Sequence, residues 1–232
     1  MIIVNIKDGL GNQMFQYATA YALAKKINTN VICDTRYLIE KKIKPPKGYI
    51  IRNFDLDIFD IKKKKINYFA LLYTMQFFNN YVLRHNITKL VDKLNFHVFM
   101  ERSRKVDFRL IKNKKKLVYI DGYWQSEDYF KDYRDEILNL YNFNDLRIKK
   151  ENILFNKEIN LENDICLNVR RTDHLNTKEL NAISINYYKN SIKYFDQKLG
   201  KISKIFIFSD DLDWCRRNFG YSERFIFVGH EK

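Results

Sequence analysis

Short apolar runs alternate with helix-like segments along most of the chain. Runs of four to five residues rich in Val, Ile and Phe occur at residues 2–6, 31–34, 117–120, 165–169, 204–208 and 224–228. Such runs are typical of strands buried in a parallel sheet. Between them, apolar residues at helical spacing predict helices at 12–27, 185–199 and 211–218. This alternation predicts an α/β fold with parallel sheets.

Two stretches depart from this alternation. Residues 66–100 are rich in Tyr, Phe and Leu at helix-like spacing, and we expect core-packing helices there. Residues 144–163 are polar and charged, without glycine or proline, and we place the connection between two domains in this stretch. The predicted organisation is an N-terminal α/β domain over residues 1–150 and a second α/β domain over residues 151–232.

The end of the apolar run at 165–169 carries the main candidate chemistry, because Arg170, Arg171, Thr172 and Asp173 follow it. Ligands of open α/β sheets bind beyond the carboxyl ends of strands, so we expect a guanidinium here to face an anionic ligand. The two arginines point to opposite sides of an extended chain, so at most one enters the crevice directly. Asp173 can orient a guanidinium. The alternative is an Arg–Asp pair that closes a surface loop.

A glycine loop follows the first predicted strand. Gly9 and Gly11, two of only seven glycines, precede the predicted helix, and this arrangement presents backbone N–H groups to an anion. Positive φ or the close approach of a ligand would explain both glycines. Asn12 and Gln13 add groups that could read a sugar or a phosphate, although Asn12 could equally be the N-cap. The spacing matches neither the dinucleotide fingerprint nor the P-loop.

Polar residues also follow the strands predicted at 117–120 and 204–208. Trp124 and Gln125 could line a cleft, although packing is the commoner fate of a tryptophan. Ser126 is a suitable N-cap for the next helix. Ser209, Asp210 and Asp211 could accept hydrogen bonds from ribose hydroxyls or a base edge. Alternatively, Ser209 caps the following helix, with acidic residues in its first turn.

An Asp-x-Asp at Asp55 and Asp57 has the pattern that holds a divalent metal in many nucleotide-sugar enzymes. Its alternation with Phe54, Leu56 and Ile58 instead places both carboxylates on the polar face of an extended edge segment. We therefore expect no metal there, since so short a motif often occurs by chance.

The net charge of +14 suggests nucleic-acid binding, but lysine outnumbers arginine 29 to 13, and Asn, Ile, Tyr and Phe are abundant together. We interpret this as a chain-wide residue bias. The lysine clusters at 41–47, 62–65 and 112–116 are typical of solvated surface, with attraction to anionic lipid headgroups as the alternative.

Other features of composition limit the location of the protein. No run of about 18 apolar residues could span a bilayer, and the first residues are predicted to form a strand rather than a signal peptide. Three widely spaced cysteines, Cys33, Cys166 and Cys215, indicate reduced thiols in a cytoplasmic protein, without zinc spacing.

Four motifs occur in a characteristic order. They are Gly-Leu-Gly-Asn-Gln-Met-Phe-Gln-Tyr-Ala (9–18), Gly-Tyr-Trp-Gln-Ser-Glu-Asp-Tyr-Phe (122–130), Asn-Val-Arg-Arg-Thr-Asp (168–173) and Phe-Ser-Asp-Asp-Leu-Asp-Trp-Cys (208–215). Together they resemble glycosyltransferase family 11, the α-1,2-fucosyltransferases, in its bacterial form. The match runs over most of the chain, and the first motif is highly specific.

The resemblance implies a GT-B-like fold of two Rossmann-type domains, with the acceptor on the first and the GDP-sugar on the second. The implied reaction transfers L-fucose from GDP-β-L-fucose to the 2-hydroxyl of a galactoside, with inversion and without a metal or other cofactor. The acceptor would be a free or lipid-linked glycan of surface polysaccharide synthesis, which places the enzyme in the cytoplasm, with peripheral contact at an anionic membrane and no nucleic-acid partner.

The resemblance also implies roles for individual residues. Arg170 would stabilise the charge that develops on the leaving GDP, with Asp173 as its orienting partner. Trp124 and Gln125 would line the acceptor. The donor-binding residues would be Gly9, Gly11, Asn12, Gln13, Asn168, Arg171, Ser209, Asp210 and Asp211.

Three departures from the family pattern accompany the resemblance. Asn168 stands where many relatives carry histidine, and Asp8 replaces the first glycine of the loop. Relatives continue for several tens of residues beyond Lys232, so we expect an incomplete second domain of about 80 residues. The alternatives are therefore a truncated, inactive relative that still binds nucleotide and, from another class, a basic nucleic-acid-binding protein. The base that deprotonates the acceptor is not identified; Asp8 and Asp173 are both candidates.

Overall fold

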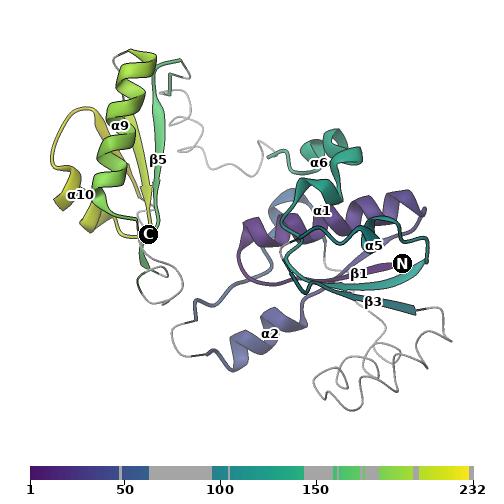
Figure 1. The fold of residues 1–232 in the computed structure, drawn as a ribbon. Coiled ribbons are helices and arrows are strands. Elements are labelled where there is room, and N and C mark those ends of the chain that lie inside the picture. The colour runs from purple at the N-terminus through teal and green to yellow at the C-terminus, as the bar shows by residue number, and fades with distance from the viewer. Residues whose placement is uncertain are drawn as a thin grey trace. The chain divides into compact units, whose positions relative to one another are not determined.

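The computed structural model describes residues 1–46, 49–62, 96–103, 105–143, 159–160, 162–172, 175, 183–200 and 204–229. The chain divides into two compact units, Met1–Arg147 (unit 1) and Ile148–Lys232 (unit 2). Each unit contains a parallel sheet accompanied by helices (Figure 1). The predicted α/β class with parallel sheets is therefore confirmed.

Unit 1 is built on a four-stranded sheet in the order β2-β1-β4-β3, with every neighbouring pair parallel. Its strands are β1 (Ile2–Asn5), β2 (Val31–Asp34), β3 (Phe96–Met100) and β4 (Leu117–Asp121). Its α-helices are α1 (Leu10–Lys26), α2 (Arg36–Ile43), α5 (Phe108–Ile111) and α6 (Arg134–Leu140), and its 3₁₀ turns are η1 (Leu56–Phe59), η2 (Glu127–Tyr129) and η3 (Lys131–Tyr133). Because the strands are parallel, their carboxyl ends meet at one edge of the sheet.

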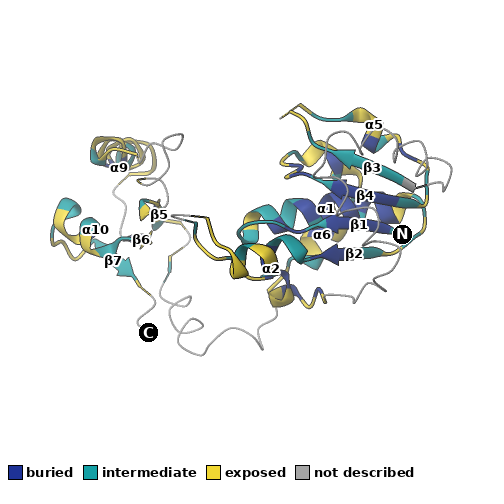
Figure 2. Cartoon of the chain, turned by 90° about the horizontal axis from the view of Figure 1, so that it is seen from below, coloured by how far each residue is buried: buried dark blue, intermediate teal, exposed yellow. Residues whose placement is uncertain are grey.

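The core of unit 1 lies on both faces of its two central strands. Val4 and Val118 pack with Ala20 and Leu23 of α1 in the main core. Ile3 belongs to a smaller cluster on the opposite face of the sheet, as expected from the alternation of side chains along a strand. Figure 2 shows buried residues concentrated in β1, β4 and α1.

Unit 2 has a three-stranded parallel sheet in the order β5-β6-β7. The strands are β5 (Ile165–Val169), β6 (Ile205–Ser209) and β7 (Phe225–Val228), and the helices are α9 (Ile185–Leu199) and α10 (Leu212–Phe219). Its core joins Val169 and Ile207 to Tyr188 of α9 and Cys215 of α10. The strands and helices predicted for this half of the chain are confirmed, with boundaries that differ by at most one residue.

Two secondary-structure predictions for unit 1 are wrong. Residues 96–100 form the edge strand β3 rather than the end of a helix; the rest of the predicted helical stretch, 66–95, lies outside the described residues. The segment around Asp55 and Asp57 is the 3₁₀ turn η1 rather than an extended edge. The turn forms because it buries Leu56 and Phe59, three residues apart, on one side, which alternation of every second residue could not do.

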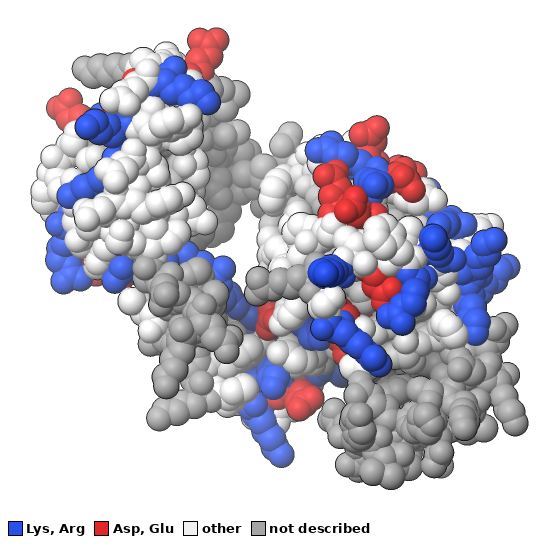
Figure 3. Space-filling model, in the orientation of Figure 1, with Lys and Arg blue, Asp and Glu red and all other residues white. Residues whose placement is uncertain are grey.

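Three further features concern the predicted environment of the protein. Cys33 and Cys215 are buried, Cys166 is exposed, and all three are free thiols. None of the helices that the structure describes combines the length and the apolar content needed to span a bilayer. On the face shown in Figure 3, lysine and arginine are spread over several parts of the surface and interspersed with Asp and Glu.

Candidate active site

The two arginines that follow β5 have different surroundings. The Arg170 side chain is exposed, whereas only 14% of the Arg171 side chain is accessible. The Arg171 Nε donates to Asp211 Oδ2 at 3.3 Å, and its guanidinium carbon lies 3.8 Å from the centre of the Trp214 ring. An ion pair and a cation–π contact thus hold the Arg171 side chain against the start of α10. Arg170 occupies the adjacent position at the carboxyl end of the strand.

Asp210 fixes the backbone directly after Arg170. Its Oδ1 accepts a hydrogen bond from the Arg171 N–H at 2.8 Å. Its Oδ2 accepts from the Thr172 N–H at 3.1 Å and from the Thr172 hydroxyl at 2.6 Å. Desolvation raises the pKa of Asp210, but these hydrogen bonds outweigh it and leave the pKa lowered. The predicted orienting partner, Asp173, lies outside the described residues.

Three other predicted donor residues, Asn168, Ser209 and Asp211, also belong to unit 2. Asp211 is the N-cap of α10, since its Oδ1 accepts from the Trp214 N–H at 3.1 Å. Ser209 does not cap this helix; its hydroxyl accepts from the Asp211 N–H at 2.9 Å, so that alternative is wrong. Asn168 is exposed on β5, paired with Phe208 of β6. The binding of a nucleoside by this group stays a prediction.

The glycine loop of unit 1 has a different geometry from the one expected. Gly9 is the N-cap of α1 with φ −79°, and Gly11 lies within the helix. The prediction of positive φ is therefore wrong for both, and the left-handed residue is Asp8, with φ 59°. A Cβ at Gly9 would lie 3.9 Å from the Arg52 guanidinium, and one at Gly11 would meet nothing within 4 Å. The open space around a Cβ on Gly11 is compatible with the other explanation, the close approach of a ligand, which stays a prediction.

The two polar residues of the loop have separate environments. Gln13 is fully buried; its Nε2 donates to the carbonyl oxygens of Asp8 and Asn53, both at 2.7 Å, and its Oε1 accepts from the Asp55 N–H at 2.9 Å. Its amide thus holds the loop to the 53–55 segment. Asn12 is not the N-cap of the helix, because α1 begins earlier, at Leu10.

The predicted acceptor-lining residues also differ from each other. Gln125 is exposed and donates from its Nε2 to the Asn12 Oδ1 at 2.6 Å, which brings two predicted site residues together. Trp124 is fully buried in the core of unit 1, with a left-handed φ of 54°. Its ring packs edge-on against Tyr129, with 5.5 Å between centroids. For Trp124 the structure supports the packing alternative.

Sequence reasoning missed a set of tyrosines around Asp8. The Asp8 Oδ2 accepts from the Tyr123 hydroxyl at 2.5 Å, and its Oδ1 accepts from the Tyr49 hydroxyl at 3.1 Å. Desolvation, followed by the interaction with Asp8, raises the pKa of both phenols, so both stay protonated donors. Tyr123 could have been found, because it follows β4, the parallel neighbour of β1. No signal in the sequence links Tyr49 to this place.

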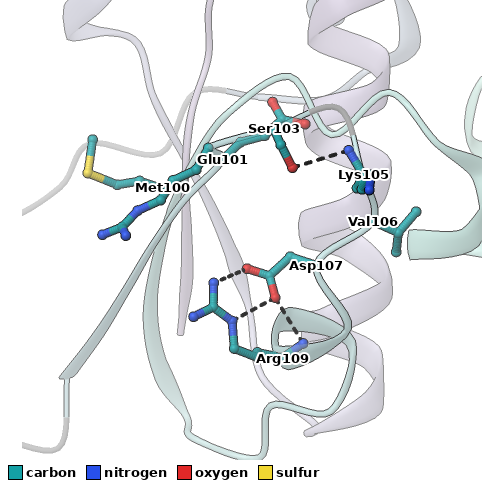
Figure 4. A pocket seen from close by; sticks show the side chains of 8 residues that line it. Met100, Glu101, Ser103, Lys105, Val106, Asp107 and Arg109 are labelled. Atoms are coloured by element: carbon teal, nitrogen blue, oxygen red, sulfur yellow. Dashed lines mark hydrogen bonds and ion pairs between the residues drawn. The ribbon is translucent and has the colours of Figure 1, made fainter.

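A hollow of about 170 Å³ lies beyond the carboxyl end of β3 (Figure 4). Asp107 accepts hydrogen bonds there from the backbone N–H, the Nε and the Nη2 of Arg109, and the side-chain bond is the main cause of its lowered pKa. The lining contains no residue that the sequence analysis selected. Among the described residues, no group of three or more His, Cys, Asp or Glu side chains is placed to hold a metal ion.

Comparison of the chain with known proteins identifies its family. The family description "Glycosyl transferase family 11" matches residues 1–230. An alpha-1,2-colitosyltransferase from Escherichia coli is 26% identical, over 94% of this chain and 71% of that protein. The O-antigen biosynthesis glycosyltransferase WbnK, also from Escherichia coli, is 26% identical, over 98% of this chain and 78% of that protein.

Solved structures agree at the level of the fold. Fucosyltransferase NodZ from Bradyrhizobium has a TM-score of 0.52 at 13% identity, covering 98% of this chain and 77% of NodZ. NodZ alpha-1,6-fucosyltransferase soaked with GDP-fucose has a TM-score of 0.51 at 13% identity, with 99% and 77% covered. At this identity the similarity concerns the fold alone. The match over nearly the whole chain confirms the resemblance in the four motifs, and the chain belongs to glycosyl transferase family 11.

Proposed function

We propose that this protein transfers L-fucose from GDP-β-L-fucose to the 2-hydroxyl of a galactoside, with inversion and without a metal. Membership of family 11 supports glycosyl transfer. A relative named for α-1,2 transfer and another named for O-antigen biosynthesis support the linkage and the setting. The structure of NodZ, a protein of similar fold whose crystals were soaked with GDP-fucose, supports GDP-fucose as the proposed donor. We further propose a GT-B arrangement, with the GDP-sugar on unit 2 and the acceptor on unit 1.

The observation that carries this proposal is the different environment of Arg170 and Arg171. As the acceptor hydroxyl gives its proton to a base and its oxygen bonds to C1 of fucose, the bond from C1 to the β-phosphate oxygen breaks, and its electron pair leaves with GDP. A fixed guanidinium stabilises that charge best when little reorganisation is needed. Arg171 and Asp210 fix the backbone at the end of β5, so the exposed Arg170 side chain starts from a defined position.

The test is product formation from GDP-fucose and lactose in the presence of a chelator. Arg170→Ala should lower kcat by about a hundredfold or more, as the loss of a group that stabilises the transition state does. Arg170→Lys should recover part of the loss, because a lysine keeps the charge but not the planar fork. Arg217→Ala, an exposed arginine of α10, is the matched control and should retain wild-type turnover.

Three results would count against the proposal in different ways. Near-normal turnover of Arg170→Ala would make that residue structural. Activity that disappears with chelator would contradict metal independence. Thermal stabilisation by GDP without any product would favour the inactive, nucleotide-binding alternative; ligand at 100 times its Kd stabilises by about 2.7 kcal/mol.

A second candidate function is the transfer of colitose, because one relative is named an alpha-1,2-colitosyltransferase. Competition between fucosyl and colitosyl donors distinguishes the two through the ratio of their kcat/KM values. If kcat/KM is higher for the fucosyl donor, the first proposal is supported. If it is higher for the colitosyl donor, that donor replaces GDP-fucose in the proposal.

A further inference from the structure

A carboxylate and several phenols meet at the carboxyl end of β1. Asp8 lies three residues after the end of β1, Tyr123 comes from the loop after β4, and Tyr49 comes from the segment after α2. The two phenols donate to different oxygens of the Asp8 carboxylate. The Tyr123 side chain is also open to solvent, with 38% of the residue exposed. The group therefore has both a defined geometry and an accessible side.

Two cations lie close to the Asp8 loop: Lys7 Nζ is 5.5 Å from the centre of the Tyr123 ring, and the Arg52 guanidinium is 3.9 Å from a Cβ placed on Gly9. The ammonium of Lys7 pairs with Asp121 Oδ1 at 2.5 Å, and Asn5 donates to the same oxygen at 3.1 Å. Among the described residues, no lysine or arginine forms an ion pair with Asp8. A carboxylate offers about four lone-pair positions, of which the two phenols use two. Asp8 can therefore accept further hydrogen bonds.

The kind of ligand follows from this charge. A carboxylate repels a phosphate at close range but accepts strong hydrogen bonds from hydroxyl groups. Sugar sites bring a few convergent polar groups together with aromatic surface, and Asp8 and Tyr123 supply both. The space before Gly11 is open at the same end of α1. At the Asp8 carboxylate itself, a neutral, hydroxyl-bearing ligand fits better than a pyrophosphate does.

We propose that Asp8 accepts a hydrogen bond from a hydroxyl group of the neutral galactoside acceptor, and that Asp8 and Tyr123 together form part of the acceptor site. This proposal rests on the proposed function, because it names the residues through which unit 1 would hold the acceptor. It also changes the chemistry of the ligand expected at the glycine loop from an anion to a sugar hydroxyl.

Suitable variants follow from the backbone at this position. Asp8 has φ 59°, a conformation that Gly and Asn adopt more readily than other residues. Asp8→Gly and Asp8→Asn therefore remove the charge without straining the backbone, although Asp8→Gly also removes the acceptor of the Tyr49 and Tyr123 hydrogen bonds. Asp60 has φ 61° and caps the C-terminus of η1 in the same unit. Asp60→Asn is thus a matched control for an aspartate-to-asparagine change at a left-handed position.

The experiment measures KM for lactose at saturating GDP-fucose, together with KM for GDP-fucose. Both Asp8 variants should raise KM for lactose by about tenfold or more, the size expected for losing a hydrogen bond to a charged group. The kcat should fall by no more than about threefold, because the interaction exists in the ground state as well. The KM for GDP-fucose should not change, and Asp60→Asn should match the wild type.

Deoxy acceptors identify the hydroxyl that Asp8 binds. For the wild type, removal of one hydroxyl other than the 2-hydroxyl should raise KM about as much as Asp8→Asn does. With Asp8→Asn, the same deoxy acceptor should cause little further loss, because the two changes remove one interaction. Fully additive losses for every hydroxyl would overturn the proposal.

Other results would overturn it as well. An unchanged KM for lactose in Asp8→Asn would remove Asp8 from the acceptor site while leaving fucosyl transfer intact. Tighter GDP binding by Asp8→Gly would show that the carboxylate faces the pyrophosphate. If the wild type forms no product, the proposed function fails. An NMR titration with lactose then tests Asp8 separately, with binding expected to weaken in Asp8→Asn and not in Asp60→Asn.

Discussion

Replacement of Asp210 by alanine tests whether the backbone after β5 must be fixed for catalysis. The Asp210 carboxylate accepts hydrogen bonds from two backbone N–H groups and one hydroxyl of Arg171 and Thr172. Without it, the segment that begins at Arg170 loses all three bonds. Asp210 does not have to contact the donor for this effect, so we treat it as a positioning residue.

The magnitude follows from the number and exposure of these bonds. A hydrogen bond to a charged group contributes about 1.5–3 kcal/mol when buried. Asp210 is exposed, so water replaces part of what is lost, and we expect a total near 1–2 kcal/mol. This corresponds to a fall in kcat of about 5- to 30-fold, smaller than the loss expected for Arg170→Ala. The free energy of unfolding should fall by no more than about the same 1–2 kcal/mol, because the bonds lie in a surface loop.

The assay compares kcat, KM and melting temperature for Asp210→Ala, Asp210→Asn and Asp213→Ala. Asparagine keeps one acceptor oxygen and should recover part of kcat. Asp213, whose side chain is 88% accessible and meets Arg216 at 3.4 Å, is the matched control, and its loss should have no effect. Wild-type kcat in Asp210→Ala would refute the reasoning, and so would equal losses in the Asp210 and Asp213 variants.

Three further predictions concern stability and accessibility. Gln13→Leu should lower the free energy of unfolding by about 2–4 kcal/mol in urea titrations, because it leaves buried backbone groups without a hydrogen-bond partner. Gln125→Leu, at an exposed position, should change the free energy of unfolding by less than about 0.5 kcal/mol. A thiol reagent should modify Cys166 alone in the native protein, and Cys33 and Cys215 only after unfolding; rapid loss of all three native thiols would contradict the described burial. Because the folded-state pKa of Asp210 is lowered, its stabilising contribution should be complete above about pH 4 and decline as pH falls through the folded-state pKa; amide NMR shifts of Arg171 and Thr172 that change mainly above pH 5 would contradict it.

The strands were predictable because their signal is local. The apolar runs at β2 and β5 carry enough Val, Ile and Leu to mark both ends of each strand. The edge strand β3 was not predictable in the same way, since Phe96–Met100 continues an aromatic stretch that also suits a helix. Pairing with β4 decides its conformation, and that pairing joins residues about twenty positions apart.

The candidate site was predictable only in outline. The rule that ligands bind beyond the carboxyl ends of parallel strands selected Arg170, Arg171 and the glycine loop. It did not show which side chains serve the fold, because that depends on partners from distant segments. The Gln13 amide forms hydrogen bonds with the 53–55 segment. The Asp210 carboxylate accepts a hydrogen bond from the backbone after β5. Each of these two side chains can form several hydrogen bonds. This capacity suits them to hold a loop, and it also makes them resemble ligand-binding residues in the sequence.

The departure of Asp8 from the family pattern has a physical explanation in this fold. Its left-handed backbone conformation suits a glycine, and aspartate is among the few other residues that tolerate it. The substitution can therefore leave the loop unchanged while it adds a negative charge beside two phenols. Unit 2, by contrast, presents a cation at the end of β5. The proposed reaction joins an anionic donor to a neutral, hydroxyl-rich acceptor, and the contrast between Asp8 and Arg170 supports the proposal that the acceptor binds to unit 1 and the donor to unit 2.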